Sequence, residues 1–91
     1  MSSTPLKVAV FASGGGTNFQ ALLDHQKTQE LWRVVLLVQN REAGAAQRAR
    51  NAGVPVLIIP TRDRDLTEIA SETLQALEEH DIDVVLLAGY L

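Results

Sequence analysis

The sequence has no cysteine, two histidines and only 4% aromatic residues. The absence of cysteine excludes disulfides, thiolate metal ligands and thiol catalysis. His25 and His80 are isolated from each other, so they lack the spacing of a metal-binding pair. We therefore expect a function that needs neither a bound metal nor a reactive thiol, and we interpret both histidines as surface residues.

Positive charge and long apolar runs are also scarce. Lysine and arginine together number 8, against 11 aspartate and glutamate residues, and the net charge is −3. A nucleic-acid-binding protein normally has a basic patch, so nucleic acid is not expected as a partner. No apolar run approaches the length of a membrane span, and the opening MSSTPLK lacks the charged start and apolar core of a signal peptide. These absences predict a cytoplasmic protein with no membrane partner.

The sequence has 91 residues, of which 46% are apolar. Along it, short continuous apolar runs alternate with segments in which apolar residues recur at helical spacing. A chain of this length makes one small domain, so we interpret residues 1–91 as a single domain. Short apolar runs predict strands at 6–12, 32–40, 54–60 and 82–91, and the β-branched run 6–12 is typical of a strand buried on both faces. Helical spacing of apolar residues predicts helices at 17–29, 42–53 and 65–80.

This order of strands and helices predicts an α/β fold. Strands that alternate with helices are joined by right-handed crossovers and form a parallel sheet covered on both faces. The expected strand order is 3-2-1-4, the Rossmann-like doubly wound arrangement. In that order the first and fourth strands are neighbours whose connections leave in opposite directions, so a crevice opens at their carboxyl ends. A ligand site is therefore expected between Gly14–Gly16 and Ala88–Leu91.

Several residues mark where the elements should begin and end. Thr17 followed by Gln20, and Asp65 followed by Glu68, are capping boxes that predict helix N-termini. Gly53 is a natural stop for the second helix. Two prolines bracket the third strand and suggest an edge position for it, namely Pro55 and Pro60. One face of the third helix is apolar and is its expected packing face, namely Leu66, Ile69, Ala70, Thr73, Leu74 and Leu77.

The stretch FASGGGTNFQ, residues 11–20, places three glycines between the first strand and the first helix. The first N–H groups of a helix have no partners within the helix, and its aligned peptide dipoles make that end electropositive. Glycines allow an anion to approach this backbone without obstruction by side chains. The loop therefore predicts a phosphate site, and a tight turn that binds nothing is the alternative.

Details of the motif narrow the kind of phosphate. A dinucleotide fingerprint needs a third glycine, where this sequence has Phe19, and a carboxylate after the second strand, which ends LVQNR. NAD is disfavoured on both counts, whereas NADP is less easily dismissed because Arg41 could meet a ribose phosphate. No Gly-Lys-Ser/Thr follows the loop, which excludes a nucleoside-triphosphate loop. A monophosphate on a sugar fits what remains.

Three segments resemble the phosphoribosylglycinamide formyltransferases, which are folate-dependent enzymes of purine synthesis. VAVFASGGGTNFQALLD is similar to the family pattern A-S-G-x-G-[ST]-N-[LF]-x-A-[IL]. NREAGAAQRARNAGVPV resembles the second helix and third strand of the family, and DIDVVLLAGYL resembles its fourth strand. The resemblance runs from Lys7 to Leu91 and corresponds to the N-terminal half of such an enzyme. One departure is Gln39-Asn40, where the family usually has Ser-Asn.

The resemblance assigns part of the loop to the phosphate of the substrate 5-phosphoribosylglycinamide. The matching residues are Gly15, Gly16, Thr17 and Asn18. The alternative for Thr17 is a helix cap, which is compatible with phosphate binding, and the alternative for Asn18 is an ordinary first-turn position.

The resemblance also implies contacts with folate. Gly89, Tyr90 and Leu91 match the start of the segment that lines the folate pocket, and the alternative for Tyr90 is a core aromatic at a strand end. Arg64 matches an arginine that contacts the folate, although the run RDRD offers Arg62 as well.

The reaction implied by the resemblance is transfer of a formyl group from the co-substrate 10-formyltetrahydrofolate to the amine of 5-phosphoribosylglycinamide, with no metal. In the family, an Asn-x-His pair and a later Asp carry the reaction by electrostatic stabilisation and proton transfer. These residues lie beyond Leu91, so we expect no catalytic residue in this chain and interpret it as a fragment that is inactive alone.

Two other interpretations stay open. A nucleotide- or flavin-binding Rossmann-like module without transferase activity would share the fold. A formyltetrahydrofolate hydrolase or a methionyl-tRNA formyltransferase would share the fold and the later chemistry, but these lack the Gly-Gly-Thr-Asn loop. Independently, the fourth strand VVLLAG is apolar throughout, and as an exposed edge it predicts marginal stability or self-association.

Overall fold

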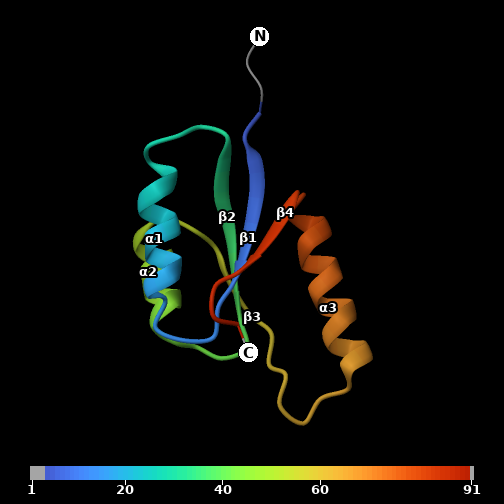
Figure 1. Cartoon of the computed structure of the whole chain (residues 1–91). Coiled ribbons are helices and arrows are strands. Elements are labelled where there is room, and N and C mark those ends of the chain that lie inside the picture. Colours follow the sequence, from blue (N-terminus) through green and yellow to red (C-terminus); the bar gives the residue numbers. More distant parts are fainter. Residues whose placement is uncertain (1–3, 91) are drawn as a thin grey trace.

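The computed structural model describes residues 4–90, in which strands and helices alternate from the N-terminus (Figure 1). The elements are β1 Leu6–Phe11, α1 Thr17–Gln26, β2 Trp32–Gln39, α2 Gly44–Asn51, β3 Val56–Ile58, α3 Leu66–Glu79 and β4 Val84–Leu87. Each expected element is present, and all seven are shorter than predicted because the flanking residues lie in turns, bends or irregular backbone. No helix in this part of the chain is long and apolar enough to cross a membrane.

The strands form one parallel sheet in the order β3-β2-β1-β4, which confirms the Rossmann-like doubly wound prediction. Helices α1 and α2 cover one face of the sheet and α3 covers the other (Figure 1). Strand β3 lies at one edge, as its flanking prolines predicted, because proline cannot donate to a neighbouring strand. The carboxyl ends of β1 and β4 are therefore neighbours, as expected.

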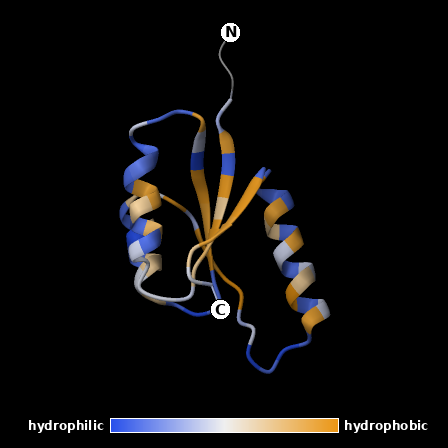
Figure 2. Cartoon of the chain, in the orientation of Figure 1, coloured by the Kyte–Doolittle hydropathy of each residue, from blue (hydrophilic) through white to orange (hydrophobic). Residues whose placement is uncertain are grey.

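Side chains of the central strands are buried on both faces of the sheet. Val8 and Val10 of β1 pack with Phe19 and Leu23 of α1, whereas Ala9 and Phe11 face the α3 side. This explains why the strands read as continuous apolar runs, without alternation. Figure 2 shows the same pattern, with hydrophobic strands between helices that carry hydrophilic outer faces.

The packing face of α3 is narrower than the sequence predicted. Ile69, Ala76 and Leu77 pack against or close over the sheet. The expected burial of three residues is wrong, because they are exposed: Leu66, Ala70 and Leu74. Ala70 and Leu74 flank the line of contact, and Leu66 is the first residue of the helix.

The helix ends follow the predictions in part. Asp65 caps α3, since its side chain accepts a hydrogen bond from the Thr67 N–H, and Gly53 has a φ of 74° just after α2, as a stop residue should. The capping box at Thr17 is wrong. The N-cap of α1 is Gly16, which places Thr17 inside the first turn, where its hydroxyl does not cap the helix.

Candidate functional site

The glycine loop lies at the carboxyl end of the sheet, between the start of α1 and the start of α2. The end of β4 lies beside it, because the Ser13 N–H donates to the Gly89 carbonyl at 3.2 Å. Just before these residues, the Ala88 N–H donates to the Phe11 carbonyl at 2.8 Å. The structure thus brings together the two segments that the strand order predicted as the lips of a ligand site.

Three carbonyl groups of the loop are held by donors from β2 and α2. The Gly14 carbonyl accepts from the Ala45 N–H at 3.2 Å and from Gln39 Nε2 at 3.3 Å. The Gly15 carbonyl accepts from Arg48 Nε at 2.9 Å, and the Ala12 carbonyl accepts from Gln39 Nε2 at 3.1 Å. These contacts turn the negative ends of the loop peptides toward the protein.

The direction of the carbonyls determines the direction of the loop amides. A trans peptide unit points its N–H opposite to its C=O. The N–H of Gly15 shares a peptide with the Gly14 carbonyl, and the N–H of Gly16 shares one with the Gly15 carbonyl. Both N–H groups therefore point away from α2, and are available to a ligand on the opposite side of the loop.

The start of α1 adds further donors. No side chain caps this helix, its first turn contains no acidic residue, and Thr17 and Asn18 are exposed. Uncapped N–H groups and the helix dipole together favour a bound anion at such an end. The residues that the resemblance assigned to phosphate, Gly15 to Asn18, therefore lie at one continuous stretch of accessible main-chain donors.

The glycines serve two different purposes. A Cβ atom on Gly14 or Gly15 would meet no protein atom within 4 Å, so these positions border open space. A Cβ on Gly16 would lie 2.6 Å from Ala45 Cβ, and Gly16 has a φ of 85°. A Cβ on Gly44 would lie 3.0 Å from the Gly15 backbone. Gly16 and Gly44 thus allow close contact between the loop and α2, and sequence reasoning missed this role of Gly44.

The segment after β4 was assigned to folate. Gly89 has a φ of 75° and its carbonyl is bonded to Ser13. The ring of Tyr90 packs edge-on against Phe11, with ring centroids 5.4 Å apart, so the ring also has the core contact that was the alternative for it. Leu91 lies outside the described residues. The folate role of this segment stays a prediction.

Arg64 makes its contacts within its own region of the chain. It donates to the Pro60 carbonyl at 2.8 Å and to both carboxylate oxygens of Glu72, and it lies 3.6 Å from Glu68. The hydrogen bond from Arg64 lowers the pKa of the Glu72 carboxyl, and the pKa of Arg64 is raised in return. Arg62, its alternative, is exposed. The structure does not bring Arg64 into contact with the glycine loop.

Neither histidine contributes to this site. His25 stacks on Trp32 with centroids 6.0 Å apart, and His80 Nδ1 lies 2.9 Å from the Ala76 carbonyl at the end of α3. Among residues 4–90 there is no group of three or more histidine, aspartate, glutamate or cysteine side chains placed to hold a metal.

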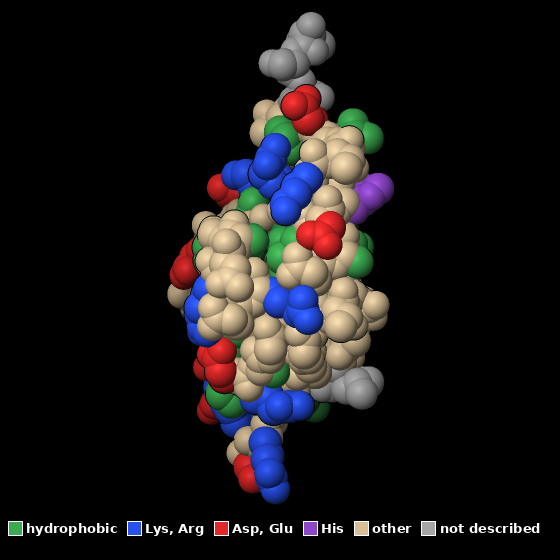
Figure 3. Space-filling model, turned by 90° about the vertical axis from the view of Figure 1, so that its left-hand side faces the viewer, with side chains coloured by type: hydrophobic (Ala, Val, Ile, Leu, Met, Phe, Trp, Pro, Cys, Tyr) green, Lys and Arg blue, Asp and Glu red, His purple; other side chains and the backbone are tan. Residues whose placement is uncertain are grey.

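The outer face that carries α1 and α2 contains side chains of both charges. Figure 3 looks onto this face and shows Lys and Arg side chains interspersed with Asp and Glu side chains. Arg48 is one of the cations of this face, and within the described part of the chain no carboxylate lies within 4.0 Å of its guanidinium. Its charge therefore adds to the attraction of the loop for an anion.

The chain is similar to known proteins in both sequence and structure. The model of the family described as formyl transferase matches residues 6–91. The chloroplastic phosphoribosylglycinamide formyltransferase of Vigna unguiculata is 42% identical over 88 residues, which cover 93% of this chain. The crystal structure of glycinamide ribonucleotide transformylase 1 from Geobacillus kaustophilus superposes with a TM-score of 0.89 at 40% identity, over 96% of this chain.

The match covers only part of these proteins. The chain spans 28% of the length of the Vigna relative and 48% of the Geobacillus chain. A phosphoribosylglycinamide formyltransferase from Bacillus halodurans gives a similar result, with a TM-score of 0.85 at 37% identity, over 92% of this chain and 45% of its own. The shared part contains the four parallel strands and the glycine loop.

Proposed function

The chain belongs to the formyl transferase family, and from this we propose that it acts in purine biosynthesis as the substrate-phosphate-binding N-terminal domain of a phosphoribosylglycinamide formyltransferase. The reaction is transfer of a formyl group from 10-formyltetrahydrofolate to the amine of 5-phosphoribosylglycinamide. A C–N bond forms at the substrate amine, which loses a proton, and the C–N bond to the folate nitrogen breaks. That nitrogen takes up a proton as tetrahydrofolate leaves. Residues 1–91 form one domain in this proposal.

The role of this chain is to hold the phosphate of 5-phosphoribosylglycinamide at Gly15, Gly16, Thr17 and Asn18. The observation that supports it is the direction of the loop peptides, whose carbonyls are tied to Gln39, Ala45 and Arg48. Main-chain donors that are already oriented lose little freedom when an anion binds. The absence of a side-chain cap on α1 leaves its first donors to the same ligand.

The folate co-substrate is proposed to lie on the other side of the crevice, against Gly89, Tyr90 and Leu91. The hydrogen bond between Ser13 and Gly89 supports this, because it places the end of β4 next to the phosphate loop. Arg64 is proposed as a further folate contact, and its bonds to Glu72 would then fix the orientation of its guanidinium. Arg62 remains the alternative for this contact.

Proton transfer and oxyanion stabilisation are assigned to residues outside positions 1–91. The chain alone is therefore expected to bind 5-phosphoribosylglycinamide without transferring the formyl group. Cytoplasmic location and pairing of β4 with another chain also stay predictions.

Substitution of Gly15 by valine tests the phosphate role. The new side chain would enter open space, so the fold should be unaffected while the approach to the loop amides is blocked. At about ten times its dissociation constant, 5-phosphoribosylglycinamide should raise the Tm of the unsubstituted chain by about 5 °C or more, and that of Gly15→Val by much less.

The control is Ala70→Val, which also introduces a valine, on the exposed face of α3, and should keep the full shift. NADP and FMN are tested separately in the same assay, as ligands of the alternative function. A Tm shift produced by either of them, with none from 5-phosphoribosylglycinamide, would favour the nucleotide-binding module and contradict the proposal.

A further inference from the structure

We propose that Gln39 and Arg48 are positioning residues that hold the glycine loop in the conformation that receives phosphate. This inference rests on the proposed function of the loop. Gln39 lies at the end of β2, and Arg48 lies in α2. Neither residue is assigned to the ligand itself.

Gln39 is the first part of this arrangement. Its side chain is fully buried, and its Nε2 donates to the carbonyls of Ala12 and Gly14 at 3.1 and 3.3 Å. Within residues 4–90 its Oε1 accepts no hydrogen bond. An unused buried acceptor lowers stability. Gln39 therefore holds the loop through its Nε2 donor alone, and its unpaired Oε1 lowers the stability of the fold.

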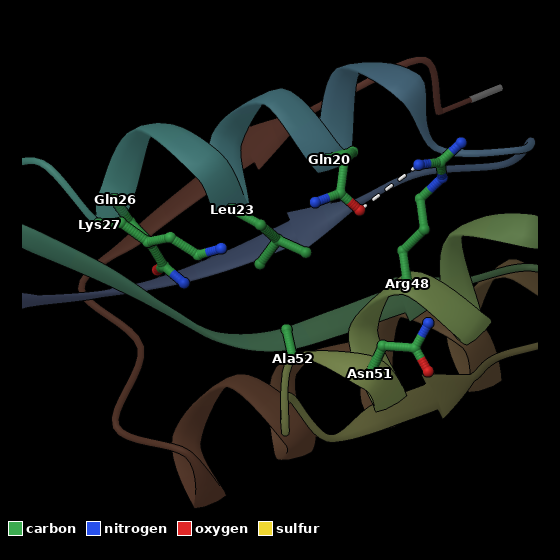
Figure 4. A pocket seen from close by; sticks show the side chains of 7 residues that line it. All are labelled: Gln20, Leu23, Gln26, Lys27, Arg48, Asn51 and Ala52. Carbon is green, nitrogen blue, oxygen red and sulfur yellow. Dashed lines mark hydrogen bonds between the residues drawn. The ribbon is translucent and has the colours of Figure 1, made fainter.

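Arg48 is the second part. Figure 4 shows its side chain extending from α2 across a cleft toward Gln20 of α1. Its Nε donates to the Gly15 carbonyl at 2.9 Å, and its Nη1 donates to Gln20 Oε1 at 3.4 Å. The guanidinium of Arg48 thus links α2, the glycine loop and α1. A shorter or differently shaped donor cannot make both hydrogen bonds at once.

The two side chains compensate for the flexibility of the loop sequence. Three consecutive glycines have a wide range of accessible conformations, and many of these would turn a carbonyl toward an incoming anion. The bonds from Gln39 and Arg48 select conformations in which the carbonyls of Gly14 and Gly15 face the protein. The affinity for phosphate should therefore depend on residues that never contact it.

Gln39→Met tests this with a neutral side chain of similar length that cannot donate. Gln75→Met is the matched control, because Gln75 is exposed on α3 and its side chain donates to Glu79 of the same helix. In the ligand-free protein, the NMR amide signals of Gly15 and Gly16 should shift in Gln39→Met and not in the control. With 5-phosphoribosylglycinamide and with inorganic phosphate, the dissociation constant should rise about tenfold in Gln39→Met only.

Arg48→Lys is the second variant, and it stays informative if Gln39→Met does not fold. It keeps the charge, so a loss of about fivefold or more in phosphate affinity would reflect loop geometry, and unchanged affinity would show that only the charge matters. Loop amide signals that stay unchanged in both variants would overturn the inference. If the unsubstituted chain binds neither ligand, the proposed function fails, whereas the ligand-free signals still report on the two positioning residues.

Discussion

At the scale of single residues, the glycine loop separates into positions that pack and positions that leave space. Gly16 has a positive φ and lies against Ala45, whereas Gly15 borders open space. The sequence shows three adjacent glycines and does not distinguish these roles, because the difference arises from a helix that follows much later in the chain. The distinction has a direct consequence for stability.

Gly16→Ala should lower the free energy of unfolding by about 2–4 kcal/mol, from backbone strain together with the contact to Ala45. Gly15→Ala should change it by less than about 1 kcal/mol. Urea denaturation of the two variants measures both values. Equal losses would contradict the assignment of Gly16 to packing and Gly15 to open space.

The pair of Arg64 and Glu72 makes a prediction about pH. Because the hydrogen bond from Arg64 lowers the pKa of Glu72 below its ordinary value of 4.5, the pair stabilises the fold above that pH. This stabilisation is lost as the pH falls from about 4.5 through the lowered pKa. Glu72→Gln should therefore be less stable than the unsubstituted chain at pH 7 and approach it in more acidic solution.

The measurement is a series of urea denaturations of both proteins between pH 7 and pH 3. Glu78→Gln is a suitable control, because it removes a carboxylate from an exposed position of the same helix. A difference between Glu72→Gln and the unsubstituted chain that does not vary with pH would contradict the ion-pair account.

Contacts between residues close in the sequence were easier to predict than contacts between residues far apart in the sequence. Asp65 was identified as a cap because it bonds two residues further along the chain. Thr17 was misassigned because Gly16 adopts a left-handed conformation and starts the helix itself. Gln39 and Arg48 contact a loop 25 or more positions away, and no local pattern indicates such contacts.

At the scale of secondary-structure elements, hydrophobic periodicity predicted the order and type of every strand and helix in residues 4–90. It did not predict how much of each apolar stripe would be covered. The periodicity of α3 predicts a broad apolar face. In the structure, only part of that face packs against the sheet. The exposure of Leu74 and the burial of Leu23 show the difference between the two helices.

Leu23→Ala in α1 should lower the free energy of unfolding by about 2–5 kcal/mol, because the side chain is only 2% exposed. Leu74→Ala in α3 should change it by no more than about 1 kcal/mol, because that side chain is 58% exposed. Thermal or urea unfolding of both variants gives the comparison. A similar cost at both positions would indicate that α3 packs more tightly than described.

At the scale of the whole molecule, the described sheet has an apolar edge at β4. This strand pairs with β1 on one side, and Val85 and Leu87 are exposed on its α3 side. Exposed apolar strand edges tend to pair with other chains. We expect the 91-residue chain to self-associate, and Leu87→Lys to weaken that association.

Sedimentation velocity over a range of protein concentrations checks this expectation. The unsubstituted chain should show a sedimentation coefficient that rises with concentration, and Leu87→Lys should show a smaller rise. Leu66→Lys provides the control, since Leu66 is comparably exposed but lies on α3. A monomer at all concentrations, with a cooperative transition at high temperature, would contradict the prediction.

The central claim is that the main-chain amides at the start of α1 bind the phosphate of 5-phosphoribosylglycinamide. The most direct test is an NMR titration of the 15N-labelled chain with this compound, and with its counterpart that lacks the phosphate. The account predicts saturable shifts at Gly15, Gly16, Thr17 and Asn18 with the phosphorylated compound only. Unchanged signals at these four amides in the folded protein, or equal shifts with both compounds, would contradict it.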